Sequence, residues 1–465
     1  MKAKLIQYVY HIQSSYWFIP MLMALAAILL AIVTGTLDQH FDSDWPRHFE
    51  WLEANRPEGA RSVLATIAGS MITVAGVTFS MTMVSVSFGS AQFGPRLVGN
   101  FMRDRGNQVT LGTFIATFVY CLMILRTVRS GVDGTAEADA VSAFVPHISV
   151  LCGLLLALAS VAVLIFFIHH IPETIHIGNI TANVGRELQK AIDKLFPARV
   201  GDPPPEEADD NRLPDGFFDQ ARAVRSQKEG YIQALDMDGL LKVAVEHDLV
   251  VRLEYRPGDF VTLGKTLIVA GPASNLGEEA ESELHALFAL GRERTPTQNI
   301  LFLVDELVEI IGRALSPGIN DPFTANTCID WLESALANFF NRNPPVAFRH
   351  DDDQRLRVVA YPVSRERFAA AIFDQTRPYV AADRNSALHM MKMIAEVISD
   401  LDNKADKDLL LRHARALMEA GKETLPLETD RDLLERRYLL TRRLAEKASL
   451  ADRLRDEQGW LGGHA

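Results

Sequence analysis

Four long apolar stretches without charged side chains constrain this chain more than any other feature of its sequence. They cover residues 16–37, 62–88, 109–125 and 140–168. About 20 consecutive apolar residues in helical form cross the hydrocarbon core of a bilayer, whereas a soluble core helix of that length shows a charged face. The sequence therefore predicts four transmembrane helices in a multi-pass membrane protein, with the lipid bilayer as a partner.

The first span resembles a secretory signal in one respect, because Lys2 and Lys4 precede it. Its apolar run is longer than the roughly 7–15 residues of a typical signal sequence, and no clear small-residue cleavage site separates it from Asp38. Cleavage is the alternative, but we expect a retained helix.

Loop charges predict the orientation. The loop between the second and third spans carries Arg96, Arg103 and Arg105 against Asp104 alone, whereas the 38–61 segment is acidic. Basic loops stay in the cytoplasm. We therefore expect a bacterial inner-membrane protein whose N-terminus and whole C-terminal portion are cytoplasmic.

The average composition conceals this division. The chain has a net charge of −12 and 48% hydrophobic residues, as many soluble acidic proteins do. Residues 1–176 hold 10 of the 47 Lys+Arg and 11 of the 59 Asp+Glu, so 37 basic and 48 acidic residues fall in 177–465. No basic face is concentrated anywhere, which argues against nucleic acid as a partner. The three cysteines predict neither a disulfide framework nor a cysteine metal site.

The cytoplasmic half is expected to be an α+β portion with three parts. Residues 177–228 predict a helical connector followed by a Pro- and acid-rich linker. In 229–275 the apolar residues alternate with a period of two, which predicts short strands and a small β-barrel-like segment. Residues 276–465 predict a mainly helical domain interrupted by one strand, Leu356–Tyr361.

Two resemblances accompany these patterns. The strand segment around Arg256–Val261 is similar to the barrel-sandwich fold of biotinyl and lipoyl carriers, but it lacks an attachment lysine at the hairpin tip. Together with Met71–Arg96, Phe167–Ile171 and Ala314–Ala325, it also resembles a bacterial family of predicted membrane proteins, domain of unknown function 2254. Thr266 departs from that pattern, where we expect proline. The resemblance covers most of the chain and implies a membrane protein without an assigned role.

The second span is unusually rich in hydroxyl groups. Spacings of three, four and seven residues place several of them on one helix face, with Gly69 and Gly76 beside them: Thr66, Ser70, Thr73, Ser80 and Ser87. Close packing through small residues is the common use of such a face in membranes, and the lining of a wet path is the alternative. No Asp, Glu, Lys or Arg lies inside a span, which argues against a proton-coupled pump or a voltage sensor.

Two features lie at the predicted cytoplasmic surface. Gly89, Gly94 and Pro95 interrupt the second span as an ordinary helix exit or as a hinge. After the fourth span, four residues share a short stretch: His169, His170, Glu173 and His176. Imidazoles and a carboxylate at this spacing predict a zinc or proton-sensing cluster, although histidines at a membrane surface usually serve as anchors.

The segment 316–325 reads as a helix end, a Pro-Gly turn and a new helix. Asp321 is the expected N-cap and Pro322 the first helical residue. Ser316, Asn320 and Asp321 are candidates for contact with a small cytoplasmic ligand or a second subunit, with structural capping as the alternative.

Signatures of common enzymes are absent: a Walker loop, a dinucleotide-binding glycine pattern, a nucleophile elbow and a His-Glu-x-x-His motif are all missing. We therefore expect no cofactor, and the sequence does not decide whether a metal binds. The favoured hypothesis is a homo-oligomeric channel or conduit gated by its cytoplasmic domain. A membrane-anchored sensor or scaffold is the second hypothesis, and a metal-dependent enzyme at the membrane surface is the third.

Overall fold

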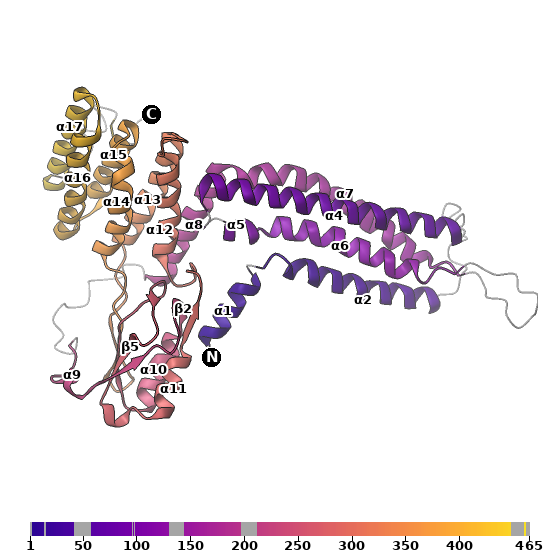
Figure 1. The fold of residues 1–465 in the computed structure, drawn as a ribbon, viewed down its shortest axis with the longest axis horizontal. Coiled ribbons are helices and arrows are strands. Elements are labelled where there is room, and N and C mark those ends of the chain that lie inside the picture. The colour runs from indigo at the N-terminus through magenta and orange to yellow at the C-terminus, as the bar shows by residue number, and fades with distance from the viewer. Residues whose placement is uncertain are drawn as a thin grey trace, which may run out of the picture. The chain divides into compact units, whose positions relative to one another are not determined.

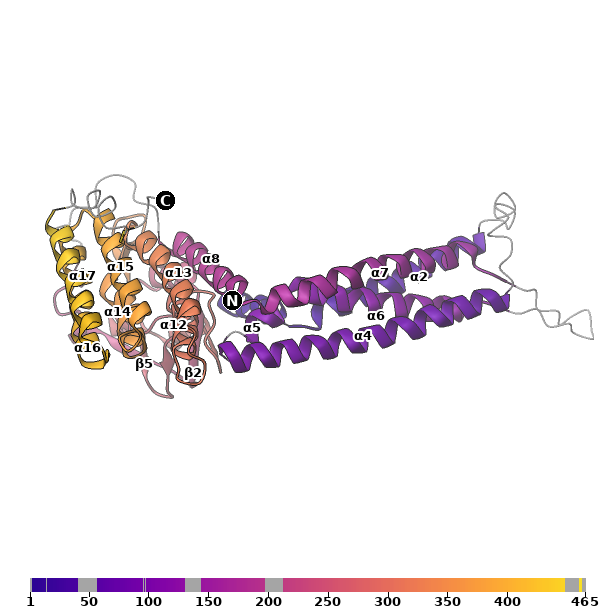
Figure 2. The same cartoon turned by 90° about the horizontal axis from the view of Figure 1, so that it is seen from above.

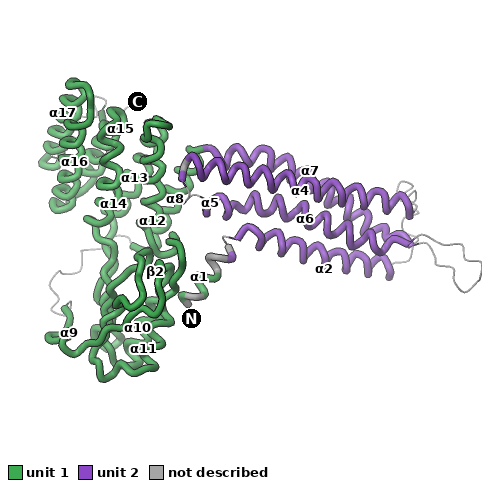
Figure 3. The backbone as a smooth tube through the Cα atoms, viewed as in Figure 1, with its two compact units in different colours: residues 1–10, 177–465 green, residues 11–176 purple. Residues whose placement is uncertain are grey.

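The structure is a computed structural model of the 465-residue chain. It describes residues 2–13, 15–40, 57–94, 96, 98–129, 144–196, 212–447 and 460–461. Two compact units divide the chain: one is made of residues 11–176, and the other joins residues 1–10 to residues 177–465 (Figure 3). Most of the Pro- and acid-rich linker, residues 41–56 of the acidic 38–61 segment and Pro95 lie outside the described residues.

The first unit contains four helices that are long and apolar enough to cross a membrane, which confirms the prediction of four spans. They are α2 (Phe18–His40), α4 (Pro57–Phe93), α6 (Arg105–Leu125) and α7 (His147–Ile175), with the short α5 (Val98–Met102) before α6. The last span continues to Ile175 instead of ending near residue 168, because Pro172 is accommodated inside the helix.

Helix α6 forms the centre of this unit. It contacts α2, α4 and α7, and both views show it between α2 and α4 (Figure 1, Figure 2). Gly112 faces Pro20 and Met23 of α2, so that these two helices approach closely. The hydroxyls of Thr117 and Ser160 lie 3.0 Å apart and are fully buried between α6 and α7. Small residues and hydrogen-bonded hydroxyls are the usual means of helix packing in membranes.

The second unit contains two open sheets, so the predicted small barrel is wrong: the strands of the described residues form no closed barrel. One sheet has the order β1-β5-β3-β8-β7, and the other has the order β4-β2-β6. Strands outside 229–275 complete both sheets, which a prediction based on local alternation cannot foresee. The strands are β1 (Arg222–Arg225), β2 (Gly230–Leu235), β3 (Val250–Leu253), β4 (Phe260–Val261), β5 (Thr266–Gly271), β6 (Phe288–Gly291), β7 (Phe348–His350) and β8 (Leu356–Val359).

Helices cover these sheets and continue as a helical array. The short helices next to the sheets are α9 (Phe217–Gln220), α10 (Met237–Glu246), η3 (Ala273–Asn275) and α11 (Glu278–Ala286). The array consists of α8 (Ile177–Leu195), α12 (Ile300–Ala314), α13 (Pro322–Phe340), α14 (Arg365–Val380), α15 (Arg384–Asp400), α16 (Lys404–Thr424) and α17 (Glu428–Glu446). Its helices lie side by side (Figure 1, Figure 2). The helical C-terminal region is thus a packed array, with buried apolar faces at the expected spacing.

The start of the chain belongs to the second unit. Helix α1 (Lys2–Gln13) places Ala3 against Ala234 and Ala289, and all three are buried. The Gln7 Nε2 group donates to Gln233 Oε1 at 2.8 Å. The segment before the first span therefore packs on the unit that follows the fourth.

Candidate functional site

The predicted hydroxyl stripe lies on the face of α4 that is turned away from the other described helices of its unit. The five side chains singled out in the sequence are all exposed: Thr66, Ser70, Thr73, Ser80 and Ser87. Thr66 and Thr73 donate their hydroxyls to the carbonyls of Ser62 and Gly69, at 2.7 and 2.8 Å. A β-carbon added at Gly69 or Gly76 would meet nothing within 4 Å. We call this surface the outer face of α4.

The opposite side of α4 also carries hydroxyls, and these are buried. Thr78 and Thr82 donate to carbonyls one turn earlier, and Ser85 does the same with Met81. The helix thus has a satisfied hydroxyl face inside the unit and a second hydroxyl face that no described residue of the unit covers.

The C-terminal end of α4 lies beyond Gly89, one of the three residues that were predicted to interrupt the second span. The helix continues through Gly89, where a β-carbon would lie 2.6 Å from the ring of Phe101, and it ends at Phe93. Gly94 then adopts a φ of +126°, a backbone conformation that favours glycine. Gly89 is therefore a packing position, and Gly94 is the helix exit.

The structure does not bring the four residues of the predicted histidine cluster together. His169 lies 3.4 Å from Glu173, and both are exposed. His170 instead contacts Asp104 at 2.9 Å and stacks on Phe166. His176 is the exposed C-cap of α7. Within the described ranges, no group of three or more His, Cys, Asp or Glu side chains is placed to hold a metal ion.

Asp104 joins two helices, because its carboxylate caps the start of α6 and also holds His170 of α7. Gly106 leaves the room for this pair: a β-carbon there would lie 2.5 Å from His170 Nε2. We expect Gly106→Ala to displace His170 and to lower the free energy of unfolding by about 1–3 kcal/mol, as overpacking does. Thermal unfolding in detergent measures the change, with Gly99→Ala, which meets nothing within 4 Å, as the control. An unchanged midpoint would show that the pair tolerates the methyl group.

The segment 316–325 adopts the predicted capping structure. The Asp321 carboxylate accepts from the Thr324 backbone N–H at 3.1 Å and from the Thr324 hydroxyl at 2.6 Å, and Pro322 begins α13. Ser316 donates its hydroxyl to the Arg313 carbonyl at 2.6 Å, and Asn320 has a φ of +49°. Because a carboxylate already occupies this helix start, the geometry favours capping over an anionic ligand.

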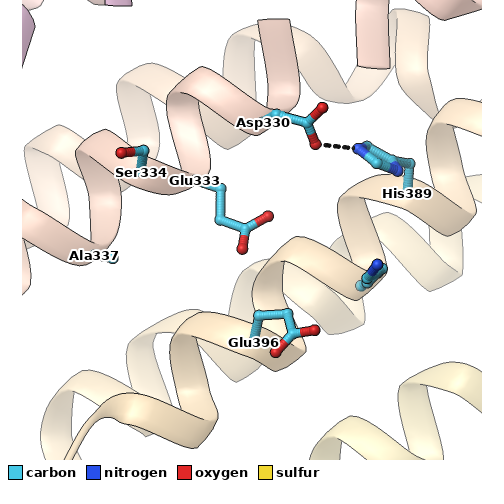
Figure 4. Close-up of a pocket in the computed structure, with 7 residues that line it drawn as sticks. Asp330, Glu333, Ser334, Ala337, His389 and Glu396 are labelled. Atoms are coloured by element: carbon cyan, nitrogen blue, oxygen red, sulfur yellow. Dashed lines mark hydrogen bonds and ion pairs between the residues drawn. The ribbon is translucent and has the colours of Figure 1, made fainter. Parts of the chain in front are cut away.

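A further site, which the sequence did not indicate, is a cavity of about 370 Å³ between α13 and α15 (Figure 4). His389 contacts Asp330 at 2.6 Å at one end. The residues that line it are Asp330, Glu333, Ser334, Ala337, His389, Lys392 and Glu396. Burial raises the pKa of Glu333 to about 7, and the carboxylates of Glu396 and Asp330 contribute, while His389 and Lys392 oppose the shift. The cavity therefore holds a carboxyl group that changes charge near neutral pH.

The helix that carries this cavity is also attached to α8. Gln189 of α8 donates to the Ser334 hydroxyl at 2.8 Å, and Asn338 donates to Asp193 at 3.0 Å. The ring of Trp331 packs against Gly185 so closely that a β-carbon there would overlap it. Because α8 follows the last span after the single residue His176, α13 links the cavity to the chain segment that leaves the membrane.

Comparison with known proteins identifies the family of the chain. The family described as Predicted membrane protein (DUF2254) matches residues 13–396. The chain belongs to this family. It is 33% identical over 309 residues to uncharacterized proteins of Mycobacterium bovis and Mycobacterium tuberculosis, over 63% of this chain and 55% of theirs. The chain thus spans about half the length of the curated relatives that it matches. No solved structure matches it.

The match to the DUF2254 family includes the outer face of α4 and the cavity between α13 and α15. The sequence pattern identified the first, because hydroxyls at helical spacing in an apolar run are conspicuous. It missed the second, because Glu333 and Glu396 are ordinary charged residues on amphipathic helices that are 63 positions apart. The sequence signal for this cavity is weak: Glu333 and Glu396 each interrupt the apolar pattern of an amphipathic helix.

The raised pKa of Glu333 predicts how the stability of this DUF2254 protein depends on pH. Its ordinary pKa is 4.5, so from about pH 4.5 to 7 the folded state binds more protons than the unfolded state, and stability falls as the pH rises through that range. We expect Glu333→Gln to be more stable than the natural chain by ~1–2 kcal/mol at pH 8, after allowance for solvent screening, and equal to it near pH 4.5.

Thermal unfolding of both proteins at several pH values checks this. Glu423→Gln, at an exposed position on α16, is the control and should show no such pH dependence. If the stability difference between Glu333→Gln and the natural chain is the same at pH 4.5 and pH 8, the raised pKa of Glu333 is contradicted.

Proposed function

We propose that the protein is an oligomeric membrane conduit in which the α4 helices of several copies surround the path. The single observation that carries the proposal is the outer face of α4, where hydroxyls and glycines are exposed in one chain. Facing lipid tails, such a face would have only carbonyls of its own helix as hydrogen-bond partners, as Thr66 and Thr73 have, and it would lose the close packing that glycine permits. Contact with other copies restores the packing, and contact with water gives the hydroxyls further hydrogen-bond partners.

The charge-free spans fit a passive path better than a coupled pump, because proton relays and voltage sensors need ionisable groups inside the membrane. The second unit is proposed to control the opening through α8, which continues from the last span. We also infer that the N-terminus and this unit lie on the same side, in the cytoplasm. The packing of Ala3 and Gln7 on the second unit supports a shared side, and four spans are consistent with it.

A thiol-accessibility experiment tests the conduit. Cysteines are placed singly at Ser70, Thr73 and Ser80 in a chain whose least buried native cysteine, Cys152, is replaced by alanine. We expect a membrane-impermeant charged thiol reagent to label these cysteines in sealed vesicles and to reduce conductance. Ile72→Cys is the matched control, because Ile72 is an exposed residue of α4 outside the stripe. If the cysteines at positions 70 and 72 are protected from the reagent to the same extent, a water-filled path along the stripe is contradicted.

A membrane-anchored sensor is the second candidate, and the cavity between α13 and α15 favours it. A site that changes charge near neutral pH and is attached to α8 is suited to receiving a signal. If the α4 cysteines stay unlabelled while Glu333→Gln changes a cellular response, the sensor is the better description.

A further inference from the structure

Helix α1 uses one of its sides to pack on the second unit. Ala3 is fully buried against Ala234 of β2 and Ala289 of β6. Four residues further along the helix, the Gln7 Nε2 group donates to Gln233 Oε1 at 2.8 Å. Positions 3 and 7 lie on one helix face, so this face of α1 is attached to strands β2 and β6 (Figure 1).

The opposite side of α1 carries an apolar stripe that is open to its surroundings. Leu5, Tyr8 and Ile12 follow one another at intervals of three and four residues, so they share one helix face. They are 63%, 66% and 38% exposed. Single exposed apolar residues are common, but three aligned on a helix of 12 residues form a surface that fits an apolar partner. We call this surface the open stripe of α1.

The place of α1 in the chain identifies the partner that is within reach. Helix α1 ends at Gln13, and the first membrane-spanning helix begins at Phe18. Even a fully extended chain covers at most about 17 Å between these two residues. Trp17, which is 57% exposed, stands directly before the span, and tryptophan rings gather at the level of the lipid headgroups. The end of α1 is therefore tethered close to the membrane surface, where lipid is the neighbouring apolar phase.

The charge of α1 favours a lipid surface over a second copy of the helix. Lys2 and Lys4 belong to α1, and the helix contains no acidic residue. Basic residues beside an apolar stripe are typical of helices that lie in the interface of a membrane with anionic lipids. Two copies of α1 placed stripe to stripe would instead bring like charges together.

We propose that α1 is an interfacial helix whose open stripe binds anionic lipids at the membrane surface. The stripe enters the boundary between the headgroups and the acyl chains, while the opposite face holds strands β2 and β6 through Ala3 and Gln7. The second unit then has a lipid contact of its own, in addition to its covalent link to the last span through α8. This contact does not depend on whether the outer face of α4 lines a conduit.

Fluorescence quenching of the full chain in lipid nanodiscs tests the position of the stripe. The nanodiscs contain equal parts of phosphatidylglycerol and phosphatidylcholine. Tyr8→Cys carries an environment-sensitive fluorophore, in a chain whose Cys152 is replaced by alanine. Leu439→Cys is the matched control, because Leu439 is also an exposed apolar residue of a helix, α17. We expect aqueous iodide to quench the fluorophore at position 8 at least ~5-fold less than the one at position 439, because an interfacial helix shields its apolar face from water.

Lipids that carry a nitroxide group distinguish shielding by lipid from shielding by protein. We expect a nitroxide near the headgroup to quench the fluorophore at position 8 more strongly than a nitroxide at the end of the acyl chain. Replacing both Lys2 and Lys4 with glutamine should raise the iodide quenching at position 8 at least ~3-fold, because the attraction to the anionic headgroups is lost. The same double change should have no such effect in nanodiscs of phosphatidylcholine alone.

Three results would overturn the proposal. Iodide quenching that is equal at positions 8 and 439 would show that the stripe faces water. Shielding from iodide without quenching by any nitroxide lipid would show that protein covers the stripe, such as a second copy of the chain. Iodide quenching that is unchanged in the lysine double variant would exclude anionic headgroups as the partner.

Discussion

Replacing Gly69 and Gly76 with leucine is expected to separate the proposed oligomer into monomers while the chain stays folded. Nothing among the described residues lies within 4 Å of a β-carbon at either position, so each new side chain begins in open space. Leucine also favours the helical conformation over glycine by about 0.5–1 kcal/mol per residue. Between copies the same side chains would hold the α4 helices apart. We expect the subunit dissociation constant to rise at least ~100-fold, which corresponds to about 2.8 kcal/mol.

Single-molecule photobleaching in lipid vesicles measures the subunit number of both proteins. Gly112→Leu is the contrasting control, because its β-carbon would lie 3.2 Å from the Pro20 backbone and 2.5 Å from Met23, so that the fold itself should be lost. An unchanged subunit number for the Gly69 and Gly76 variant, or a natural chain that is monomeric in lipid, would remove the basis of the conduit.

Alanine replacements then distinguish a conduit from simple packing. Ser70, Thr73 and Ser80 lose only small polar groups when they become alanine, and a packing interface should tolerate this loss. A water-filled path should change its conductance or selectivity, because the lining loses hydroxyls. Subunit number and conductance therefore answer separate questions about the same face.

The sequence was sufficient to predict the four spans and the hydroxyl stripe of the membrane unit, because both patterns are local in the chain. A span is defined by the absence of charge over about 20 residues, and the stripe on α4 follows from helical spacing alone. What the sequence could not supply was which face of α4 the chain covers. Thr78 and Ser80 look alike in a hydropathy pattern, yet one is buried and the other exposed because of the positions of α6 and α7.

The soluble unit shows the opposite situation. Its sheets are completed by strands far apart in the chain, such as β8 beside β3, so local alternation led to a barrel where two open sheets form. The cavity between α13 and α15 likewise depends on tertiary packing, which alone brings Glu333 close to Glu396 and raises its pKa.

Asp38 is another residue whose role depends on a distant partner. Its acidity predicted only that it precedes a non-cytoplasmic loop. In the structure it lies in the last turn of α2 and accepts from the backbone N–H groups of Ile148 and Ser149, both at 2.9 Å. The Ser149 hydroxyl also donates to it, at 2.6 Å. Tyr120 of α6 donates to the Ser149 carbonyl at 3.0 Å, so this contact joins three of the four spans.

We therefore expect Asp38→Ala to lower the free energy of unfolding of the membrane unit by about 2–4 kcal/mol. The change removes three hydrogen bonds to a charged acceptor and leaves the start of α7 without its cap, and each charged hydrogen bond contributes about 1.5–3 kcal/mol before the ends of the helices relax toward water. Asp38→Asn keeps one acceptor oxygen and should lose about half as much. Unfolding in mixed micelles of mild detergent and dodecyl sulfate measures these differences.

Thr36→Ala provides the matched control on the same turn of α2, since Thr36 is exposed and its hydroxyl donates only to the Val33 carbonyl. We expect it to change the free energy of unfolding by less than about 0.5 kcal/mol. If Asp38→Ala and Thr36→Ala have the same free energy of unfolding, the cap does not stabilise the bundle, and Asp38 acts only as a charge beside the loop. If Asp38→Ala unfolds much earlier, the end of the bundle farthest from Asp104 along α6 is held by a charged contact between helices, as the Asp104–His170 pair holds the other end.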